Sequence, residues 1–329
     1  MIRARVGWLL GALAACGEGG SPPPVGAQVG TALAAALEAA GQNKQPWRCG
    51  APDGPALAPE TLAVGDHRWK LADHTVTFAD EPRRGARRAF VVGAIADAGG
   101  AAPSTLAALG RLRTQLARAD LVLALGGMGR TQTELEATLG AIAEQARYPV
   151  VALPGDLEDT AALTAAVGAL RARGMHVLDG RLVQRVEIPG ATIALVPGGG
   201  AASRLVAGVE GCAYRAADVA ATFVELTKRP GIRIVASAEA PRITLGGEPS
   251  GELALTPSAG HEIDLVVHGR VSSTASRART GARDAGAVAV TPGTADATLR
   301  LPGPLRAPTA GLVTIHGASW SWKPVADAE

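Results

Sequence analysis

The chain reads Phe90-Val91-Val92-Gly93, then Leu121-Val122-Leu123-Ala124-Leu125, then Val150-Val151-Ala152-Leu153, three apolar runs that are each followed by the pattern of an amphipathic helix. Continuous apolar strands joined by crossover helices are typical of a parallel sheet that is covered on both faces. We predict that the helices begin at a cap on Ser104, at a capping box from Thr131 to Glu134, and near Glu158. The sequence therefore predicts an α/β fold.

The second half of the chain contains shorter strand patterns with fewer helices between them. Two strands flank the turn Pro189-Gly190, and the helix pattern of residues 217–228 precedes a strand over 232–236. Further strand patterns cover residues 265–267, 287–290 and 312–315. Short strands of this kind favour antiparallel pairing, so we expect a second, more antiparallel sheet that packs on the first and includes residues 312–315.

The N-terminus has the pattern of a bacterial lipoprotein leader. Arg3 and Arg5 precede an apolar run that is too short to span a bilayer, and the run ends in the lipobox Leu13-Ala14-Ala15-Cys16. We expect residues 1–15 to be a signal peptide, Cys16 to carry a lipid, and residues 16–28 to be a flexible tether. The alternative is an ordinary signal peptide with an incidental cysteine. Either form predicts an extracytoplasmic protein, and the lipid predicts a protein anchored to a membrane of the cell envelope.

A helix pattern begins at Val29, and a hairpin pattern covers residues 67–72 and 75–78. We expect residues 29–84 to form an N-terminal extension and residues 85–329 to form the main domain. Once Cys16 carries lipid, Cys49 and Cys212 remain as an even pair in an oxidising compartment, which favours a disulfide over two free thiols.

The charge balance argues against polyanionic partners. Removing Arg3 and Arg5 from the 32 basic residues leaves as many basic as acidic residues, which number 30. A nearly neutral chain has no basic field to attract nucleic acid, so nucleic acid is excluded as the expected partner.

Five short motifs follow successive predicted strands, where ligands bind in α/β sheets. The motifs are Gly93-Ala94-Ile95-Ala96-Asp97, Gly126-Gly127-Met128-Gly129-Arg130, Pro154-Gly155-Asp156-Leu157-Glu158, Ser237-Ala238-Glu239-Ala240-Pro241 and His268-Gly269-Arg270-Val271-Ser272. Their order and spacing resemble those of the calcineurin-like metallophosphoesterase family, over about residues 89–322. The resemblance implies a four-layer α/β/β/α sandwich, in which two mixed sheets are flanked by helices around a centre of two divalent metal ions.

That family carries Asp-x-His, Gly-Asp, Gly-Asn-His-Asp or Glu, a lone His and Gly-His-x-His at these places, and most of its metal ligands are replaced here. The residues at the family's site positions are Ala94, Ala96, Gly127, Asp156, Leu157, Ala238, Arg270 and Ser272. Two adjacent dications need several carboxylates and imidazoles, and of this set Asp156 is the residue that could still coordinate. Leu157 replaces the His that assists the leaving group, so general acid catalysis is lost at that position.

Arg270 adds a further obstacle to metal binding. Its guanidinium cannot lose its proton, and at about 4 Å from a dication it would cost roughly 8 kcal/mol at an effective dielectric constant near 20. We therefore expect no metal cofactor, no catalytic residues of the two-metal type, and a pseudoenzyme with this fold.

Other polar residues in the same motifs allow two weaker hypotheses. Asp97, Asp156, Glu158, Glu239 and His268 could form a different, single-metal site, although capping of a helix explains Asp156 and Glu158 equally well. The side chains of Arg130 and Arg270 could instead bind an anionic group.

The sequence thus predicts a membrane-anchored lipoprotein that binds or scaffolds an unknown protein or small molecule. One alternative is an active metal-dependent phosphoesterase with a rebuilt site. Another is a periplasmic solute-binding lipoprotein, which would have two similar lobes joined by a hinge.

Overall fold

The computed structural model describes ten segments of the chain. They are residue 49 and residues 54–80, 89–155, 158–199, 211–239, 243–245, 248–250, 263–270, 289–290 and 309–325. The predicted signal peptide, the lipidated Cys16, the tether and the helix from Val29 lie outside these residues. So do Asp156, Leu157, Ser272 and the side chain of Arg270.

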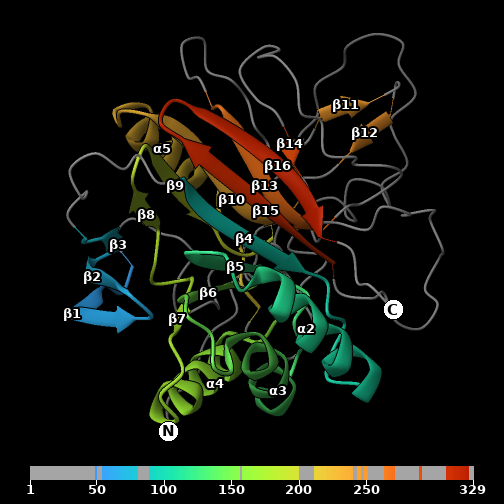
Figure 1. Ribbon diagram of the computed structural model, residues 1–329. Coiled ribbons are helices and arrows are strands. Elements are labelled where there is room, and N and C mark those ends of the chain that lie inside the picture. Colours follow the sequence, from blue (N-terminus) through green and yellow to red (C-terminus); the bar gives the residue numbers. More distant parts are fainter. Residues whose placement is uncertain are drawn as a thin grey trace, which may run out of the picture. The chain divides into compact units, whose positions relative to one another are not determined.

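Six strands form the first sheet (Figure 1). Their order across the sheet is β16 (Ser319–Val325), β15 (Thr309–His316), β4 (Phe90–Ala96), β5 (Leu121–Leu125), β6 (Val150–Leu153) and β7 (Val177–Asp179). The strands from β4 to β7 are parallel, and β15 pairs antiparallel with both β4 and β16. Every residue of β5 and β6 is buried, as expected for apolar strands covered on both faces.

Eight strands form the second sheet. Their order is β1 (Leu57–Val64), β2 (His67–Asp73), β3 (Thr75–Phe78), β8 (Arg185–Ile188), β9 (Ala191–Val196), β10 (Ile232–Glu239), β13 (Leu265–Arg270) and β14 (Ala289–Val290). The run from β9 to β14 is parallel, whereas β1, β2 and β3 pair antiparallel and β8 pairs antiparallel with β9. A separate hairpin joins β11 (Ile243–Leu245) to β12 (Glu248–Ser250).

In the described segments, four helices cover the outer faces of the two sheets. They are α2 (Pro103–Leu116), α3 (Gln132–Ala143) and α4 (Thr160–Ala172), which pack on the six-stranded sheet, and α5 (Ala216–Thr227), which packs on the eight-stranded sheet. The facing sides of the sheets share one apolar cluster that includes Leu123 from β5 and Ile234 from β10. The layers are therefore helix, sheet, sheet and helix, which confirms the predicted four-layer α/β/β/α class (Figure 1).

Local signals explain where most helices begin. The predicted capping box is present at α3, where Oγ1 of Thr131 accepts from the Glu134 amide and the Glu134 carboxylate accepts from the Thr131 amide. Helix α4 begins one residue after Asp159, whose carboxylate accepts from the Ala162 amide. The prediction of a cap on Ser104 was wrong, because α2 already begins at Pro103, a residue whose fixed φ and missing N–H suit a first helical position.

One prediction of sheet membership needs correction, and the sheet that holds the N-terminal hairpin can now be stated. Residues 312–315 were expected in the second sheet, but β15 pairs with β4 in the first, and the second sheet is parallel through its centre. The predicted hairpin over residues 67–78 is present, yet it is not separate from the sandwich, because β3 pairs in parallel with β8. The strands before residue 84 are thus part of the eight-stranded sheet.

Among the described residues, none of the helices has the length and apolar character needed to cross a membrane.

Candidate functional site

The five strand-end motifs converge at the edge where the carboxyl ends of both sheets meet. A Cβ atom added to Gly126 after β5 would lie 2.9 Å from Cβ of Ala238 in β10 and 3.1 Å from the Gly155 nitrogen after β6. A Cβ atom on Gly269 in β13 would lie 1.9 Å from the Leu125 carbonyl oxygen. The second motif, or the strand residue just before it, therefore packs closely against the third, fourth and fifth motifs, across the two sheets.

The first motif is held against the second by backbone hydrogen bonds. The Asp97 amide donates to the Gly126 carbonyl at 3.1 Å, and the Gly99 amide donates to the Gly127 carbonyl at 2.7 Å. Ala94 and Ala96 in β4 are fully buried. Their methyl groups belong to the apolar cluster between the sheets and have no lone pair to offer a cation.

Gly127 stands at the second-motif position and has no room for a side chain. Its φ of +69° lies in the left-handed region, and a Cβ atom there would lie 2.8 Å from Oδ1 and 2.9 Å from Cα of Asp97. Both the conformation and the neighbouring residue require glycine. A side chain at this position would therefore strain the backbone and overlap with Asp97.

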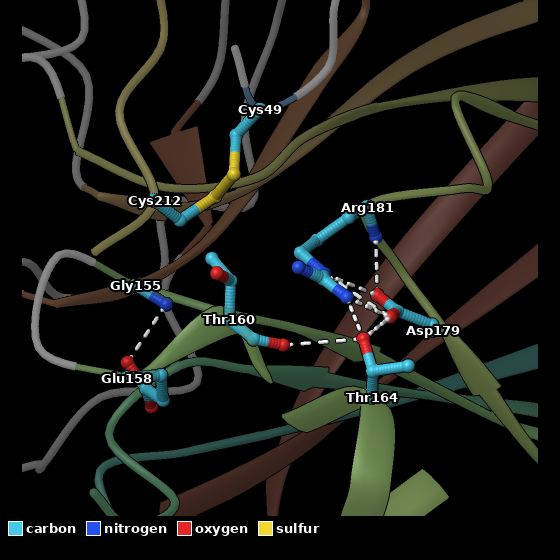
Figure 2. The surroundings of a disulfide bond; sticks show 8 residues. All are labelled: Cys49, Gly155, Glu158, Thr160, Thr164, Asp179, Arg181 and Cys212. Atoms are coloured by element: carbon cyan, nitrogen blue, oxygen red, sulfur yellow. Dashed lines mark hydrogen bonds and ion pairs between the residues drawn. A yellow bond between two sulfur atoms is a disulfide. The ribbon is translucent and has the colours of Figure 1, made fainter. Parts of the chain in front are cut away.

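Glu158, the last residue of the third motif, links that motif to the second, and Figure 2 shows its contact with Gly155. Its side chain is buried, and its two carboxylate oxygens accept from the Met128 amide at 2.9 Å and the Gly155 amide at 2.8 Å. Two backbone donors that face the strand-end edge are therefore satisfied by the protein's own carboxylate. The sequence reasoning attributed Glu158 to the start of α4, but α4 begins at Thr160 and Glu158 instead ties two loops together.

Glu239 and His268 lie on the other face of the eight-stranded sheet. Side chains alternate along a strand, so Glu239 shares its face with Val235, and His268 shares its face with Val266. Val235 and Val266 both pack in the cluster formed by α5. Ala238, on the opposite face, meets Gly126. Glu239 and His268 therefore face away from Ala238 and Gly126. The predicted single-metal site also includes Asp156, which lies outside the described residues, so it stays a hypothesis.

Tyr214 is a neighbour of Glu239 that the sequence reasoning missed. Its hydroxyl donates to Oε2 of Glu239 at 2.8 Å, and the Glu239 amide donates to Oγ of the buried Ser237 at 3.1 Å. Ser237 is the register partner of His268 in the parallel pair β10–β13. A polar cluster thus lies on the α5 face of the eight-stranded sheet, with a spacing of 25 residues between Tyr214 and Glu239 that no local pattern reveals.

A buried ion pair after β7 is a second feature that the sequence reasoning missed (Figure 2). Arg181 donates from Nε and from a terminal guanidinium nitrogen to Asp179, at 2.9 and 2.6 Å, and both side chains are 5% exposed. Thr164 in α4 donates to the same carboxylate at 3.2 Å and receives a hydrogen bond from Arg181. The two buried charges neutralise each other. Because Thr164 of α4 bonds the same carboxylate, the pair also joins β7 to α4.

The described residues do not fit a metal centre. No three of their His, Cys, Asp and Glu side chains are placed so that they could hold a metal ion together. Arg130 is exposed, and its amide donates to the Glu134 carboxylate at 2.8 Å. Arg270 is described through its backbone, which pairs with Glu239, so the predicted joint binding of an anion by Arg130 and Arg270 stays a hypothesis.

Cys49 and Cys212 are joined by a disulfide beside this edge, with their Cα atoms 5.4 Å apart (Figure 2). Both residues are fully buried. This is the pairing that the even cysteine count favoured over two free thiols.

Comparison with known proteins gives matches among solved structures alone. No protein family model and no curated protein matches the chain. One crystal structure matches with a TM-score of 0.50 and 12% identity, and the alignment covers 73% of this chain and 100% of the other. At this identity the likeness shows a shared fold and nothing about activity.

Two further solved structures match less closely. The crystal structure of TT1561 of Thermus thermophilus has a TM-score of 0.45 and 13% identity, over 72% of this chain and 99% of the other. The purple acid phosphatase PPD1 from yellow lupin (Lupinus luteus) seeds has a TM-score of 0.43 and 12% identity, over 78% of this chain and 56% of the other.

Proposed function

We propose that this chain is a lipid-anchored protein of the cell envelope that has a calcineurin-like metallophosphoesterase fold and acts by binding or scaffolding. In this proposal it is a pseudoenzyme that does not hydrolyse phosphate esters. The observation that carries the proposal is Gly127, because its left-handed backbone and its contact with Asp97 leave no space for a metal-bridging carboxylate.

The neighbouring positions support the same conclusion. Two-metal hydrolysis requires ligands that hold both ions and a group that activates water or protonates the leaving oxygen. Ala94, Ala96 and Ala238 are buried and carry no donor atoms in their side chains. Glu158, the buried carboxylate that contacts Gly155 of the third motif, already accepts two backbone hydrogen bonds.

An active phosphoesterase with a rebuilt site is the main rival. The test is elemental analysis of the purified full chain after incubation with Mn²⁺, Fe²⁺ or Zn²⁺, together with turnover of bis-p-nitrophenyl phosphate. We expect no metal in defined ratio after gel filtration and no hydrolysis above that of the buffer with the same metal. One or two tightly held ions per chain together with hydrolysis would overturn the proposal.

The solute-binding alternative is disfavoured by the arrangement of the strands. That class of protein requires two similar lobes that close about a hinge. The described strands instead form two facing sheets around one shared apolar cluster. The binding or scaffolding activity that we propose would therefore use a surface of this sandwich.

A further inference from the structure

The segment Gly211–Tyr214 runs between the two sheets at their carboxyl edge. Gly211 forms an antiparallel bridge with Asp159, the residue that caps α4 on the six-stranded sheet. Two residues later, Ala213 forms a parallel bridge with Gly199, which follows β9 of the eight-stranded sheet. One short segment thus contacts the strand-end loops of both sheets.

Further hydrogen bonds hold this segment on the eight-stranded sheet. The Gly199 amide donates to the Cys212 carbonyl at 3.0 Å, and the Tyr214 amide donates to the Gly199 carbonyl at 3.2 Å. The Tyr214 hydroxyl reaches Glu239, the last residue of β10. The segment therefore lies beside the ends of β6, β9 and β10, the edge at which α/β sheets bind their ligands.

The disulfide fastens this segment to a distant part of the chain. Cys49 is linked to Cys212, and its amide also donates to the Ala213 carbonyl at 3.1 Å. Gly198 packs directly on Cys212, since a Cβ atom there would lie 2.8 Å from the Cys212 sulfur. The Gly198 amide in turn donates to the Pro154 carbonyl of the third motif at 2.7 Å, which adds a direct link between the sheets.

We propose that Gly211–Tyr214 is a strap that closes the carboxyl edge of the sandwich, and that the Cys49–Cys212 disulfide locks the strap in place. Cleavage of the disulfide by a dithiol releases this edge. It leaves unchanged the opposite, amino edge, where the strands of the six-stranded sheet such as β4 and β5 begin. In that reaction one thiolate of the dithiol attacks a cysteine sulfur, and the second thiol resolves the mixed disulfide. The dithiol is oxidised to a disulfide, and two electrons and two protons convert Cys49 and Cys212 to thiols.

The distribution of hydrogen bonds explains why the effect should be local. The strap contacts Asp159, Gly199 and Glu239, which all lie at or after the carboxyl ends of strands. Glu158, which joins the second and third motifs, is the residue next to Asp159. The amino edge has its own hydrogen bonds, such as that from the Val91 amide to Oδ2 of Asp120 at 2.8 Å. Local opening of one edge is therefore separable from global unfolding.

The test is amide hydrogen exchange, measured by NMR for the full chain and for its Cys49→Ala/Cys212→Ala variant. We expect the amides of Gly199, Tyr214, Gly155 and Met128 to exchange about tenfold faster or more in the variant, because they lie at the released edge. The amides of Val91 and Val122, at the amino edge, should keep their rates within about twofold.

Two arms keep this experiment decisive. Should the variant fail to fold, the folded wild-type chain is reduced with a dithiol, alkylated at both thiols and measured in the same way. The matched control is Asp120→Ala, which removes the side-chain acceptor of the Val91 amide; it should accelerate Val91 and leave Gly199 and Tyr214 unchanged. Unchanged exchange at Gly199 and Tyr214 after loss of the disulfide would overturn the proposal. Equal acceleration at both edges would also overturn it, because the disulfide would then stabilise only the fold as a whole.

Discussion

Glu158 shows how one buried side chain holds two loops together. Its carboxylate accepts hydrogen bonds from two backbone amides in two motifs, and these bonds stabilise its buried charge. The loops of the second and third motifs are therefore joined through this one side chain.

Glu158→Gln should lower the free energy of unfolding by about 1–3 kcal/mol, because the new NH₂ group cannot accept from a backbone amide and one buried donor loses its partner. Urea unfolding followed by circular dichroism measures the change. The matched control is Glu144→Gln, whose side chain is 59% exposed in its pair with Arg113, and it should change stability by less than about 1 kcal/mol. Equal effects of the two variants would contradict the assigned role of Glu158.

Gly127→Asp restores the residue type that the resembling family carries at this position. It should destabilise the chain by about 2–4 kcal/mol, since it combines a left-handed non-glycine residue with overlap against Asp97. It should not create metal affinity, and isothermal titration with Mn²⁺ checks this point. A stable variant that binds Mn²⁺ would show that Gly127 is not a structural barrier.

At this scale the sequence names the residues at the motif positions but does not reveal their surroundings. The replacement of ligands by Ala94, Ala96 and Ala238 follows from the motif positions alone. The separation of Glu239 and His268 from Glu158 does not, because it depends on which face of a strand each side chain occupies. A shift of one residue in the strand reverses that face, and motif spacing does not fix it.

At the scale of elements, His67 connects three segments at the amino edge. Its Nδ1 lies 2.6 Å from Oδ2 of Asp80 after β3, and its Nε2 lies 3.3 Å from Oδ1 of Asp120 before β5. Burial acts to raise the pKa of Asp80, but the hydrogen bonds and charges of His67 and Arg68 hold that pKa below its usual value. The hairpin β2–β3 is thereby joined to the six-stranded sheet.

Acid should weaken this junction. A carboxylate whose pKa is lower in the folded state contributes stability above its unfolded pKa, and this contribution is lost as the pH falls through the folded pKa. We therefore expect the thermal midpoint to fall more steeply below about pH 4 in the wild type than in Asp80→Asn. The control Asp66→Asn removes a carboxylate that is 81% exposed and should keep the wild-type slope. Parallel curves for the wild type and Asp80→Asn would contradict the prediction.

Element boundaries followed the sequence where a local signal exists. The capping box at Thr131 and the alternation of apolar strands with helices are local signals, and both were interpreted correctly. The membership of β15 was not, because the choice between two sheets for a C-terminal apolar strand depends on pairing with β4, more than 200 residues earlier in the chain. The pairing of β3 with β8 is non-local in the same way.

At the scale of the whole molecule, the proposed lipid on Cys16 can be tested apart from the fold. Processed wild-type protein should begin at Cys16, carry the mass of a diacylglyceryl group and partition into the detergent phase of Triton X-114, because two acyl chains give stable anchoring. Cys16→Ser should lack that mass and partition into the aqueous phase. A wild-type chain with an unmodified N-terminus in the aqueous phase would refute the anchor while leaving the proposed pseudoenzyme fold untouched.

The link between Cys49 and Cys212 also makes a covalent ring, since 163 positions of sequence separate its ends. A protease that cuts once inside this ring produces two pieces that sulfur still holds together, so the nicked molecule keeps its full mass until it is reduced. A cut outside the ring leaves two fragments with no covalent link between them. After a single cut inside the ring, strands β4 to β7 thus stay covalently joined to the rest of the chain.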